Sequence, residues 1–283
     1  MAETGILYIC ATPIGNLEDV SIRLLKTLRQ ADLIACEDTR HTIKLLNRYK
    51  IHKPLTSYHQ HSHLAKEDLI LQELAAGKRV ALVSDAGMPA ISDPGADLVL
   101  RALEAGIKVE AIPGPSALIT ALALSGLDTQ SFIFIGFLPA KSGQRRELLS
   151  SLADQPRTMI FYEAPHRLLK TLADMEELLG AERPIAVARE LTKAYEEIRR
   201  GSIREVAAYF REHEPRGEFT LVLAGKQPEA PTADMEQIAR EVQQLIANGM
   251  DKKEAFKTKA REYGIRKSEI YNYYLKYHDQ FKD

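Results

Sequence analysis

Short apolar runs alternate with amphipathic stretches through the first 126 residues, and this alternation constrains the fold more than any other feature of the sequence. Each run has the length and composition of a buried strand, and each following stretch has the spacing of a helix. The runs are ILYICAT (6–12), LIACED (33–38), PLTSYH (54–59), VALVSDA (80–86) and VEAI (109–112). Strands that alternate with helices favour a parallel sheet covered by helices, so the sequence predicts an α/β fold.

The alternation changes beyond Gly126, where five strand-like runs have only three amphipathic stretches between them. These runs are FIFIGF (132–137), TMIFYE (158–163), PIAVARE (184–190), EEIRRGS (196–202) and EFTLVLAG (218–225). At least one pair of strands therefore lacks a crossover helix, which favours a mixed sheet. The sequence predicts a parallel-sheet domain over residues 1–127 and a second, mixed-sheet α/β domain over residues 128–226.

A Pro-rich polar segment, KQPEAPTAD (226–234), ends the strand pattern and predicts a linker. We expect residues 227–283 to form this linker and a small helical C-terminal extension of three short helices. Asp251 can cap the middle helix and Ser268 the last. Gly249 and Gly264 lie where the first two helices should end.

The extension is rich in basic and tyrosine side chains. Between Lys252 and Lys276 there are eight Lys or Arg against three Glu, and four tyrosines lie at 271, 273, 274 and 277. RNA bases stack on such rings while ammonium groups meet phosphates. Alternatively, the tyrosines form the core of a helical appendage and the lysines its solvated face. The pattern leaves both interpretations open.

The composition excludes several classes of protein. With 45% hydrophobic and 27% charged residues the chain has the balance of a globular protein, and a net charge of -1 gives no overall attraction to nucleic acid. A nucleic-acid partner would need a local basic patch. The first residues, MAETGILYIC, contain no signal-peptide pattern and no apolar run could cross a bilayer, so we expect a cytoplasmic protein without a membrane partner. Cys10 and Cys36 lie in strand-like runs and are expected in the core.

Gly, Pro, Ser and Asp gather where strands of the predicted parallel sheet end. The four loops are ATPIGN (11–16), EDTR (37–40), SDAGMPAISDPG (84–95) and PGPSA (113–117). The carboxyl ends of parallel strands meet at one edge of the sheet, so these loops should outline one pocket. A helix expected to begin at Pro115 would offer free backbone NH groups to a carboxylate or phosphate. No loop is GxGxxG or GxxxxGK[ST], which argues against a dinucleotide or a P-loop nucleotide.

Several motifs in fixed order resemble the small-subunit rRNA branch of the tetrapyrrole methylase family, over about residues 5 to 226. They are TPIGNLED, ACEDTR, SYHQHS, VSDAGMPAISDPG, PGPSA, FYEAPHR and ARELTKAYEE. The resemblance implies a two-domain tetrapyrrole-methylase-like fold, an S-adenosylmethionine donor and a homodimer. It also implies 2'-O-methylation of the ribose of a cytidine in the decoding centre of small-subunit (16S) rRNA. Tetrapyrrole-modifying relatives read GxGxGD where this chain reads TPIGNLED, which argues against a tetrapyrrole substrate. Methylation of a tetrapyrrole precursor is the alternative activity, and a non-enzymatic protein that binds RNA through its C-terminal extension is a third interpretation.

The resemblance also assigns ten donor-binding positions. Those in the first domain are Pro13, Asp85, Ala86, Gly87, Met88, Ile91, Ser116 and Ala117. Those in the second domain are Tyr162 and Leu191.

A ribose hydroxyl is a poor nucleophile at neutral pH, so a neighbouring group has to accept its proton. Charged residues at the expected strand ends are the catalytic candidates: Glu37, Asp38, Arg40, Glu163, Arg189, Glu190 and Lys193. We expect Glu37 or Glu190 to accept the proton, while Arg40, Arg189 and Lys193 hold phosphate or polarise the hydroxyl. Alternatively, Glu37 with Arg40, or Arg189 with Glu190, form ion pairs at the domain junction.

Basic residues outside this cleft are candidates for contacts with the rRNA backbone. In the second domain they are Lys141, Arg145 and Arg146, expected to be exposed, with His166 and Arg167; in the extension they are Lys252, Lys253 and Lys257, with Tyr271 as a stacking ring. A solvated face, or helix capping by His166, is the alternative. His59, His61 and His63 alternate, but no carboxylate or Cys shares their spacing, so we expect them to line the substrate or lie at the surface and predict no metal site.

Overall fold

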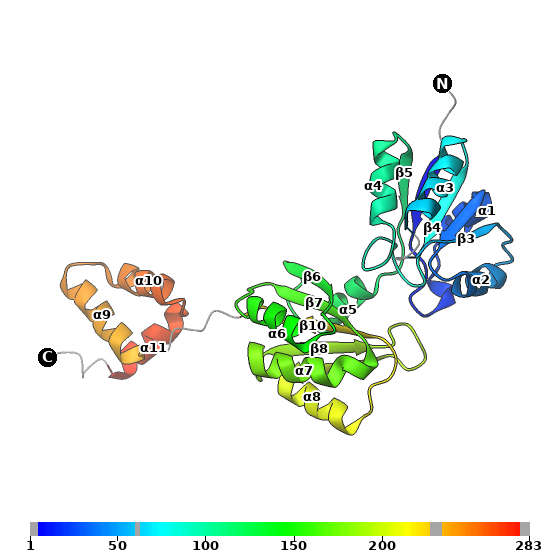
Figure 1. Ribbon diagram of the computed structural model, residues 1–283. Helices are drawn as coiled ribbons and strands as arrows, with labels where there is room; N and C mark the ends of the chain where they lie inside the picture. Colours follow the sequence, from blue (N-terminus) through cyan, green and yellow to red (C-terminus); the bar gives the residue numbers. More distant parts are fainter. Residues whose placement is uncertain (1–4, 60–62, 227–233, 278–283) are drawn as a thin grey trace. The chain divides into compact units, whose positions relative to one another are not determined.

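The computed structural model describes residues 5–59, 63–226 and 234–277, and the chain divides into two compact units, Met1–Gly225 and Lys226–Asp283 (Figure 1). The first unit contains two five-stranded sheets, and the second unit is helical. Among the described residues, the helices are too short or too polar to cross a bilayer.

The first sheet is parallel throughout, as the alternating runs predict. Its strands lie in the order β3-β2-β4-β1-β5. They are β1 (Ile6–Cys10), β2 (Leu33–Cys36), β3 (Leu55–Ser57), β4 (Arg79–Val83) and β5 (Lys108–Ile112). The connections carry the 3-10 turn η1 (Leu17–Asp19) and the helices α1 (Ile22–Gln30), α2 (Thr39–Arg48), α3 (His63–Ala75) and α4 (Ala96–Glu104).

Side chains of the first sheet alternate between two cores, one on each face. Ala81 and Val83 pack with α1 and α2, whereas Val80 and Leu82 pack with α3 and α4. This period of two follows from the pleat of a strand, and burial on both faces explains why the runs are continuously apolar. Cys10 and Cys36 are buried in the first of these cores, which confirms their expected place.

The second sheet is mixed, as predicted, with the order β6-β7-β10-β8-β9. Its strands are β6 (Phe132–Phe137), β7 (Thr158–Glu163), β8 (Pro184–Arg189), β9 (Glu197–Ser202) and β10 (Phe219–Leu223). Only β6 and β7 pair in parallel; the other three pairs are antiparallel. Helices α6 (Ser142–Ser151), α7 (Pro165–Leu179) and α8 (Ile203–Glu212) are the three between them, and they pack with one face of the sheet.

Helix α5 (Ala117–Ser125) follows the last strand of the first sheet but packs on the second sheet. Its Ala121 and Leu122 contact a cluster that includes Ile160 and Val222. The helix begins two residues later than expected, because Pro115 is followed by an extended Ser116 that forms the N-cap. The expected domain boundary near residue 127 stays a prediction.

The second unit consists of α9 (Met235–Ala247), α10 (Lys252–Tyr263) and α11 (Lys267–Tyr277), in agreement with the three helices expected. Asp251 caps α10 by accepting hydrogen bonds from the NH groups of Lys253 and Glu254, and Gly264 ends that helix in the left-handed conformation. The prediction that Ser268 caps the last helix is wrong, since α11 already includes Lys267.

Candidate active site

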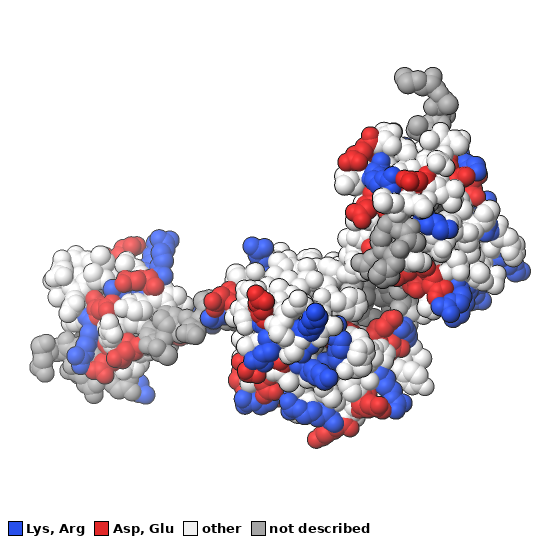
Figure 2. Space-filling model, viewed as in Figure 1, with Lys and Arg blue, Asp and Glu red and all other residues white. Residues whose placement is uncertain are grey.

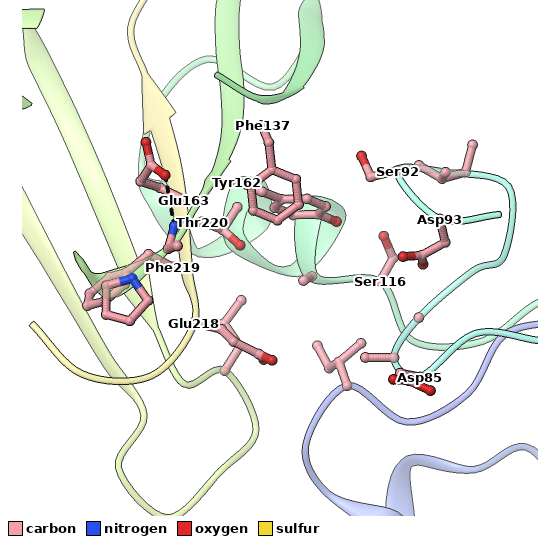
Figure 3. A pocket seen from close by; sticks show the side chains of 18 residues that line it. Asp85, Ser92, Asp93, Ser116, Phe137, Tyr162, Glu163, Glu218, Phe219 and Thr220 are labelled. Carbon is pink, nitrogen blue, oxygen red and sulfur yellow. Dashed lines mark hydrogen bonds between the residues drawn. The ribbon is translucent and has the colours of Figure 1, made fainter. Parts of the chain in front are cut away.

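A cavity of about 340 Å³ lies where strands of both sheets in the first unit end (Figure 3). From the first sheet and the start of α5 it is lined by Ile14, Asp85, Ala86, Gly87, Ile91, Ser92, Asp93, Ser116 and Ala117. From the second sheet it is lined by Phe137, Tyr162, Glu163, Ala164, Pro165, Leu191, Glu218, Phe219 and Thr220. Its size and its largely apolar lining are typical of a small-molecule site.

The loop after β4 is fixed by an exchange of backbone hydrogen bonds with the loop after β1. Thr12 NH donates to the Gly87 carbonyl over 2.8 Å, and Gly87 NH donates to the Thr12 carbonyl over 3.1 Å. Gly87 has a φ of +80°, a conformation that glycine adopts without strain. Ala90 and Ser92 also have positive φ values, of 67° and 63°. Such strain in non-glycine residues is frequent at functional sites.

The N-terminus of α5 forms the adjacent part of the cavity. Gly114 passes so close to β1 that a Cβ would lie 3.1 Å from the Ala11 Cβ, which explains the glycine in the PGPSA turn. Ser116 is the N-cap, but its hydroxyl makes no capping hydrogen bond. The first turn of α5 therefore presents backbone NH groups and a positive dipole end beside the cavity.

Aromatic rings form the facing wall. The Tyr162 ring lies 5.0 Å from that of Phe134 and 5.5 Å from that of Phe137, between ring centroids. Burial raises the pKa of the Tyr162 phenol, and Phe137 remains 56% exposed. This wall offers apolar contact to a ligand.

Acidic side chains gather at the ends of β2 and β4. The two Asp85 oxygens contact Asp38 NH at 3.1 Å and His41 Nδ1 at 3.0 Å. Asp38 forms a hydrogen-bonded ion pair with Arg40, which lowers the pKa of Asp38 to about 2. Burial and the nearby Asp85 and Asp38 raise the pKa of Glu37.

Asp38, His41 and Asp85 each place one potential metal-ligand atom within 4.8 Å of the others. Their donor and acceptor atoms are already engaged with Arg40, with backbone NH groups and with one another. This arrangement explains their proximity without an ion.

Asp93 is a cavity residue to which the sequence assigned no role. Burial, followed by the neighbouring Glu37, raises the pKa of its carboxyl to about 6. The residue belongs to the SDAGMPAISDPG loop, so its acidic side chain at a strand end was the available signal. Also missed were Ser92, Phe137, Glu218, Phe219 and Thr220.

The structure gathers eight of the ten expected donor contacts around the cavity: Asp85, Ala86, Gly87, Ile91, Ser116, Ala117, Tyr162 and Leu191. Pro13 and Met88 are not part of its lining. Pro13 is buried beside Ile14, and Met88 packs against the core under α3 and α4. Their role toward the donor stays a prediction.

Of the expected catalytic residues, Glu163 lines the cavity, whereas Glu37, Asp38, Arg40, Arg189, Glu190 and Lys193 are not part of its lining. Lys193 Nζ donates to Glu190 Oε1 over 2.9 Å and to Glu218 Oε2 over 3.0 Å. Burial opposes ionisation of Glu190, but hydrogen bonds from Lys193 and from Glu218 NH outweigh it and lower the pKa. The ion pairs considered from the sequence, Glu37–Arg40 and Arg189–Glu190, are not found among the described residues. Arg189 pairs with Glu197 at 3.5 Å, and Arg40 pairs with Asp38.

The basic residues expected to meet RNA differ in exposure. The prediction that Arg145 is exposed is wrong: it is 5% exposed, and its Nε donates to Asp174 over 2.6 Å. A buried guanidinium needs such a partner, which removes it from the surface. Arg146 is paired with Asp174 and Glu177. Arg167 is largely buried beside Glu163, whereas Lys141 and His166 are exposed.

The helical unit divides its tyrosines between core and surface. Tyr274 is 2% exposed and packs in the core with Phe256, whereas Tyr271 is 40% exposed. Lys252, Lys253 and Lys257 are exposed, and Lys252 Nζ lies 5.9 Å from the centre of the Tyr271 ring. Figure 2 shows acidic side chains interspersed with basic ones on the visible face of each unit. His61 and the side chain of His63 lie outside the described residues, and His59 is exposed after β3.

Comparison with known proteins identifies the class that this fold and cavity define. Residues 6–207 match the model of the Tetrapyrrole (Corrin/Porphyrin) Methylases, and the chain belongs to this family. It is 50% identical over 268 residues to the Ribosomal RNA small subunit methyltransferase I of Synechocystis, covering 94% of this chain and 96% of that protein. It is 45% identical over 278 residues to the protein of the same name from Bacillus subtilis, covering 96% and 95%.

Solved structures of more distant proteins share the fold. Uroporphyrin-III-C-methyltransferase from Thermus thermophilus has a TM-score of 0.56 at 20% identity, covering 78% of this chain and 94% of that chain. Cobalt precorrin-4 methyltransferase has a TM-score of 0.59 at 21% identity, covering 77% and 94%. At these identities the likeness concerns the architecture alone.

Proposed function

We propose that this protein transfers a methyl group from S-adenosylmethionine to the ribose 2'-hydroxyl of a cytidine in the decoding centre of small-subunit rRNA. The observation that carries the proposal is the cavity, which is lined by eight expected donor contacts from both sheets. Relatives 43% to 51% identical are named Ribosomal RNA small subunit methyltransferase I, and they supply the substrate class.

The residues present fit the donor. Gly87 and Gly114 bring backbone close to the cavity, and a Cβ at Gly87 would lie 3.6 Å from Ile14 Cγ2, within the space the cavity uses. The apolar wall of Phe137 and Tyr162 suits the thioether and adenine parts of such a molecule. Carboxylates on the opposite side suit its positive charge. When bound, the donor supplies a methyl group on a positively charged sulfur.

The chain's own residues position the reactants and accept the proton of the ribose hydroxyl. An apolar wall excludes water, and fixed strand-end loops hold the reacting groups in line, which lowers the entropic part of the barrier. We keep Glu37, Asp38, Arg40, Glu190 and Lys193 as candidates for catalysis and for holding the rRNA backbone. Arg40 lies in the first turn of α2 with its side chain 85% exposed, and its pairing with Asp38 makes it a weaker candidate for holding phosphate.

Contacts with the rRNA belong to the same proposal. The exposed Lys141, Lys252, Lys253 and Lys257 carry positive charge that suits phosphates, the exposed His166 can donate a hydrogen bond to one, and the exposed Tyr271 suits a base. Arg146 and Arg167 are paired with carboxylates, so we assign them a weaker part. A homodimer acting in the cytoplasm completes the proposal.

The decisive experiment incubates the protein with labelled S-adenosylmethionine and small ribosomal subunits from cells that lack it, followed by mapping of the labelled nucleotide. We expect label on one ribose 2'-oxygen of a cytidine. Label on a base, or transfer only to a tetrapyrrole precursor, would reject the proposal; the second result would favour the alternative that the distant structures represent. Parallel assays with free rRNA identify the form of the acceptor.

A further inference from the structure

Four carboxylates line the cavity, and they differ in what holds them. They are Asp85, Asp93, Glu163 and Glu218. A group that accepts a proton from a substrate hydroxyl needs a free oxygen lone pair, a place beside the reacting atoms and a pKa near the working pH. The partners of each carboxylate therefore decide which of them fits this role.

Three of the four are engaged. Glu163 accepts hydrogen bonds from Thr171 Oγ1 at 2.5 Å and from Ala164 NH at 2.9 Å, and it lies 3.3 Å from Arg167 Nε. Glu218 is bound by Lys193. Both oxygens of Asp85 have partners, one in Asp38 NH and one in His41 Nδ1.

Asp93 is the exception. Among the residues that the structure describes, it has no ion pair with a Lys, Arg or His side chain. The neighbouring Ser84 hydroxyl donates to the carbonyls of Ala86 and Gly87, over 3.3 and 3.2 Å. The ionisable groups around it are Glu37, Asp85 and the phenol of Tyr162. All three are acidic groups, and no cation is found beside Asp93 in the part of the chain that the structure describes, so the charge of its carboxylate is poorly compensated.

The backbone before Asp93 keeps its side chain in this place. Ala90 and Ser92 are both left-handed, and the Ala90 NH donates to the Pro94 carbonyl over 3.3 Å, which closes a tight turn around Asp93. Gly95 ends the turn at a position where a Cβ would lie 2.8 Å from Leu82 Cδ2. A loop this constrained costs conformational energy, which is typical of segments that fix a functional group. Figure 3 shows Asp93 on the same side of the cavity as Asp85, Ser92 and Ser116.

We propose that the carboxylate of Asp93 accepts the proton of the ribose hydroxyl during methyl transfer. This inference rests on the proposed function and deepens it. The O–H bond of the ribose breaks and its proton passes to Asp93, while the ribose oxygen forms a bond to the methyl carbon. The bond between that carbon and sulfur breaks, and its electron pair stays on sulfur, which leaves a neutral thioether. Charge balances, because the sulfonium and the carboxylate are both neutralised.

The surroundings of Asp93 set the pH range of this step. Burial and Glu37 raise its pKa to about 6, so the carboxylate is ready to accept a proton above that pH and is already protonated below it. The rate of methyl transfer in the wild-type protein should therefore fall as the pH drops through about 6.

The test compares the wild-type protein with Asp93→Asn in single-turnover methylation of small subunits. Asn keeps the shape of the side chain, but it cannot take the proton. We expect a loss of at least about 10²-fold at about pH 8, together with loss of the acidic limb of the pH profile. Donor affinity by calorimetry should stay within about threefold. Asp97→Asn, on the exposed first turn of α4, is the matched control and should behave as wild type.

Two further measurements separate this role from a structural one. Carbon NMR should show a carboxyl that titrates near pH 6 in the wild-type protein and is missing from Asp93→Asn. The melting temperature of Asp93→Asn at neutral pH should equal or exceed that of wild type, because a charge without a cationic partner is removed. A clearly lower melting temperature would indicate a structural role and overturn the inference.

The outcomes for function and for Asp93 remain distinguishable. If the wild-type protein labels no rRNA, the proposed function fails. If it does so and Asp93→Asn retains activity within about tenfold at high pH, the function stands and the inference fails. Glu37→Gln and Glu190→Gln test the two acceptors expected from the sequence; a larger loss in either than in Asp93→Asn would likewise overturn the inference.

Discussion

The first sheet brings Asp85 and Asp93 to the cavity, whereas the second sheet brings Glu163 and Glu218. Both carboxylates from the second sheet are held by a cation, Arg167 or Lys193. Of those from the first sheet, Asp85 is bound by Asp38 NH and His41 Nδ1, whereas Asp93 lies near the acids Glu37 and Asp85 and has no ion pair among the described residues. Groups of the protein therefore hold three of the four carboxylates, whereas Asp93 in the first-sheet half remains available to a ligand.

The two halves of the cavity, one lined from the first sheet and one from the second, also differ in construction. The first half consists of loops with positive φ values at Gly87, Ala90 and Ser92, so its shape depends on backbone conformation. The second half consists of side chains at strand ends, where Phe137 and Tyr162 pack against each other. The comparison predicts that substitution of the free carboxylate in the first half changes the chemistry, whereas substitution of the paired carboxylates and their partners in the second half changes mainly stability.

The largest expected effect on stability concerns Glu163. Arg167 is largely buried, and Glu163→Gln removes the carboxylate that its charge faces. Breaking a buried ion pair in this way lowers the free energy of unfolding by about 3 kcal/mol. Urea unfolding of the first unit within the whole chain measures this. The double variant Glu163→Gln/Arg167→Met should recover part of the loss. If Glu163→Gln changed the free energy of unfolding by less than about 1 kcal/mol, the paired carboxylates of the second sheet would not be stabilising groups, and the two halves of the cavity would not differ in this way.

A smaller effect is expected for Gly87→Ala. The new methyl group would enter the space between Ile14 and Pro115 at a residue with a φ of +80°, so donor affinity should fall about tenfold, which is about 1.4 kcal/mol. Titration calorimetry with S-adenosylmethionine measures this. Gly106→Ala is the control, because Gly106 has a φ of +69° and no atom within 4 Å of a Cβ. Equal affinity loss in both variants would show that backbone strain alone is responsible.

The pH dependence of stability should reveal Asp93 itself. Its folded pKa of about 6 lies above its ordinary value, so the folded state binds more protons between about pH 4 and 6 and loses stability as the pH rises through this window. Asp93→Asn lacks this loss. Because the side chain is only half-buried, the variant should gain about 1 kcal/mol over wild type between these pH values. A constant difference between the two unfolding curves across that range would contradict the assignment.

The smallest effect is expected for Lys193→Met. Its ammonium group pairs with Glu190 and with Glu218, whose side chain is 76% exposed. Pairs of this kind contribute under about 1 kcal/mol to the free energy of unfolding. Chemical unfolding of this variant beside Glu163→Gln provides the direct comparison. A loss as large as that of Glu163→Gln would show that exposure does not determine which ion pairs stabilise the second half.

The sequence predicted the features that depend on residues close to one another along the chain. The apolar runs predicted the parallel and mixed sheets. The amphipathic stretch after LIACED forms α2, because Asp38 caps this helix and its apolar spacing is regular. The loops that form the first half of the cavity were also predicted, since parallel strands always place their carboxyl ends together.

Contacts between distant segments were not predicted. Arg145 is buried because Asp174, 29 residues away, pairs with it. Phe219 and Thr220 reach the cavity because β10 inserts between β7 and β8, and no local pattern specifies that strand order. The role proposed for Asp93 rests on the hydrogen bonds and ion pairs that hold the other three carboxylates of the cavity. These contacts exist only in the folded site, so the SDPG motif alone does not predict them.

Helix α5 leaves the first sheet and packs on the second, and Ser116 at its N-terminus lies in the cavity wall. A molecule seated there touches a segment that connects the first sheet to the second. Because such a molecule binds only when both walls of the cavity are folded, we expect the bound donor to stabilise the two sheets together.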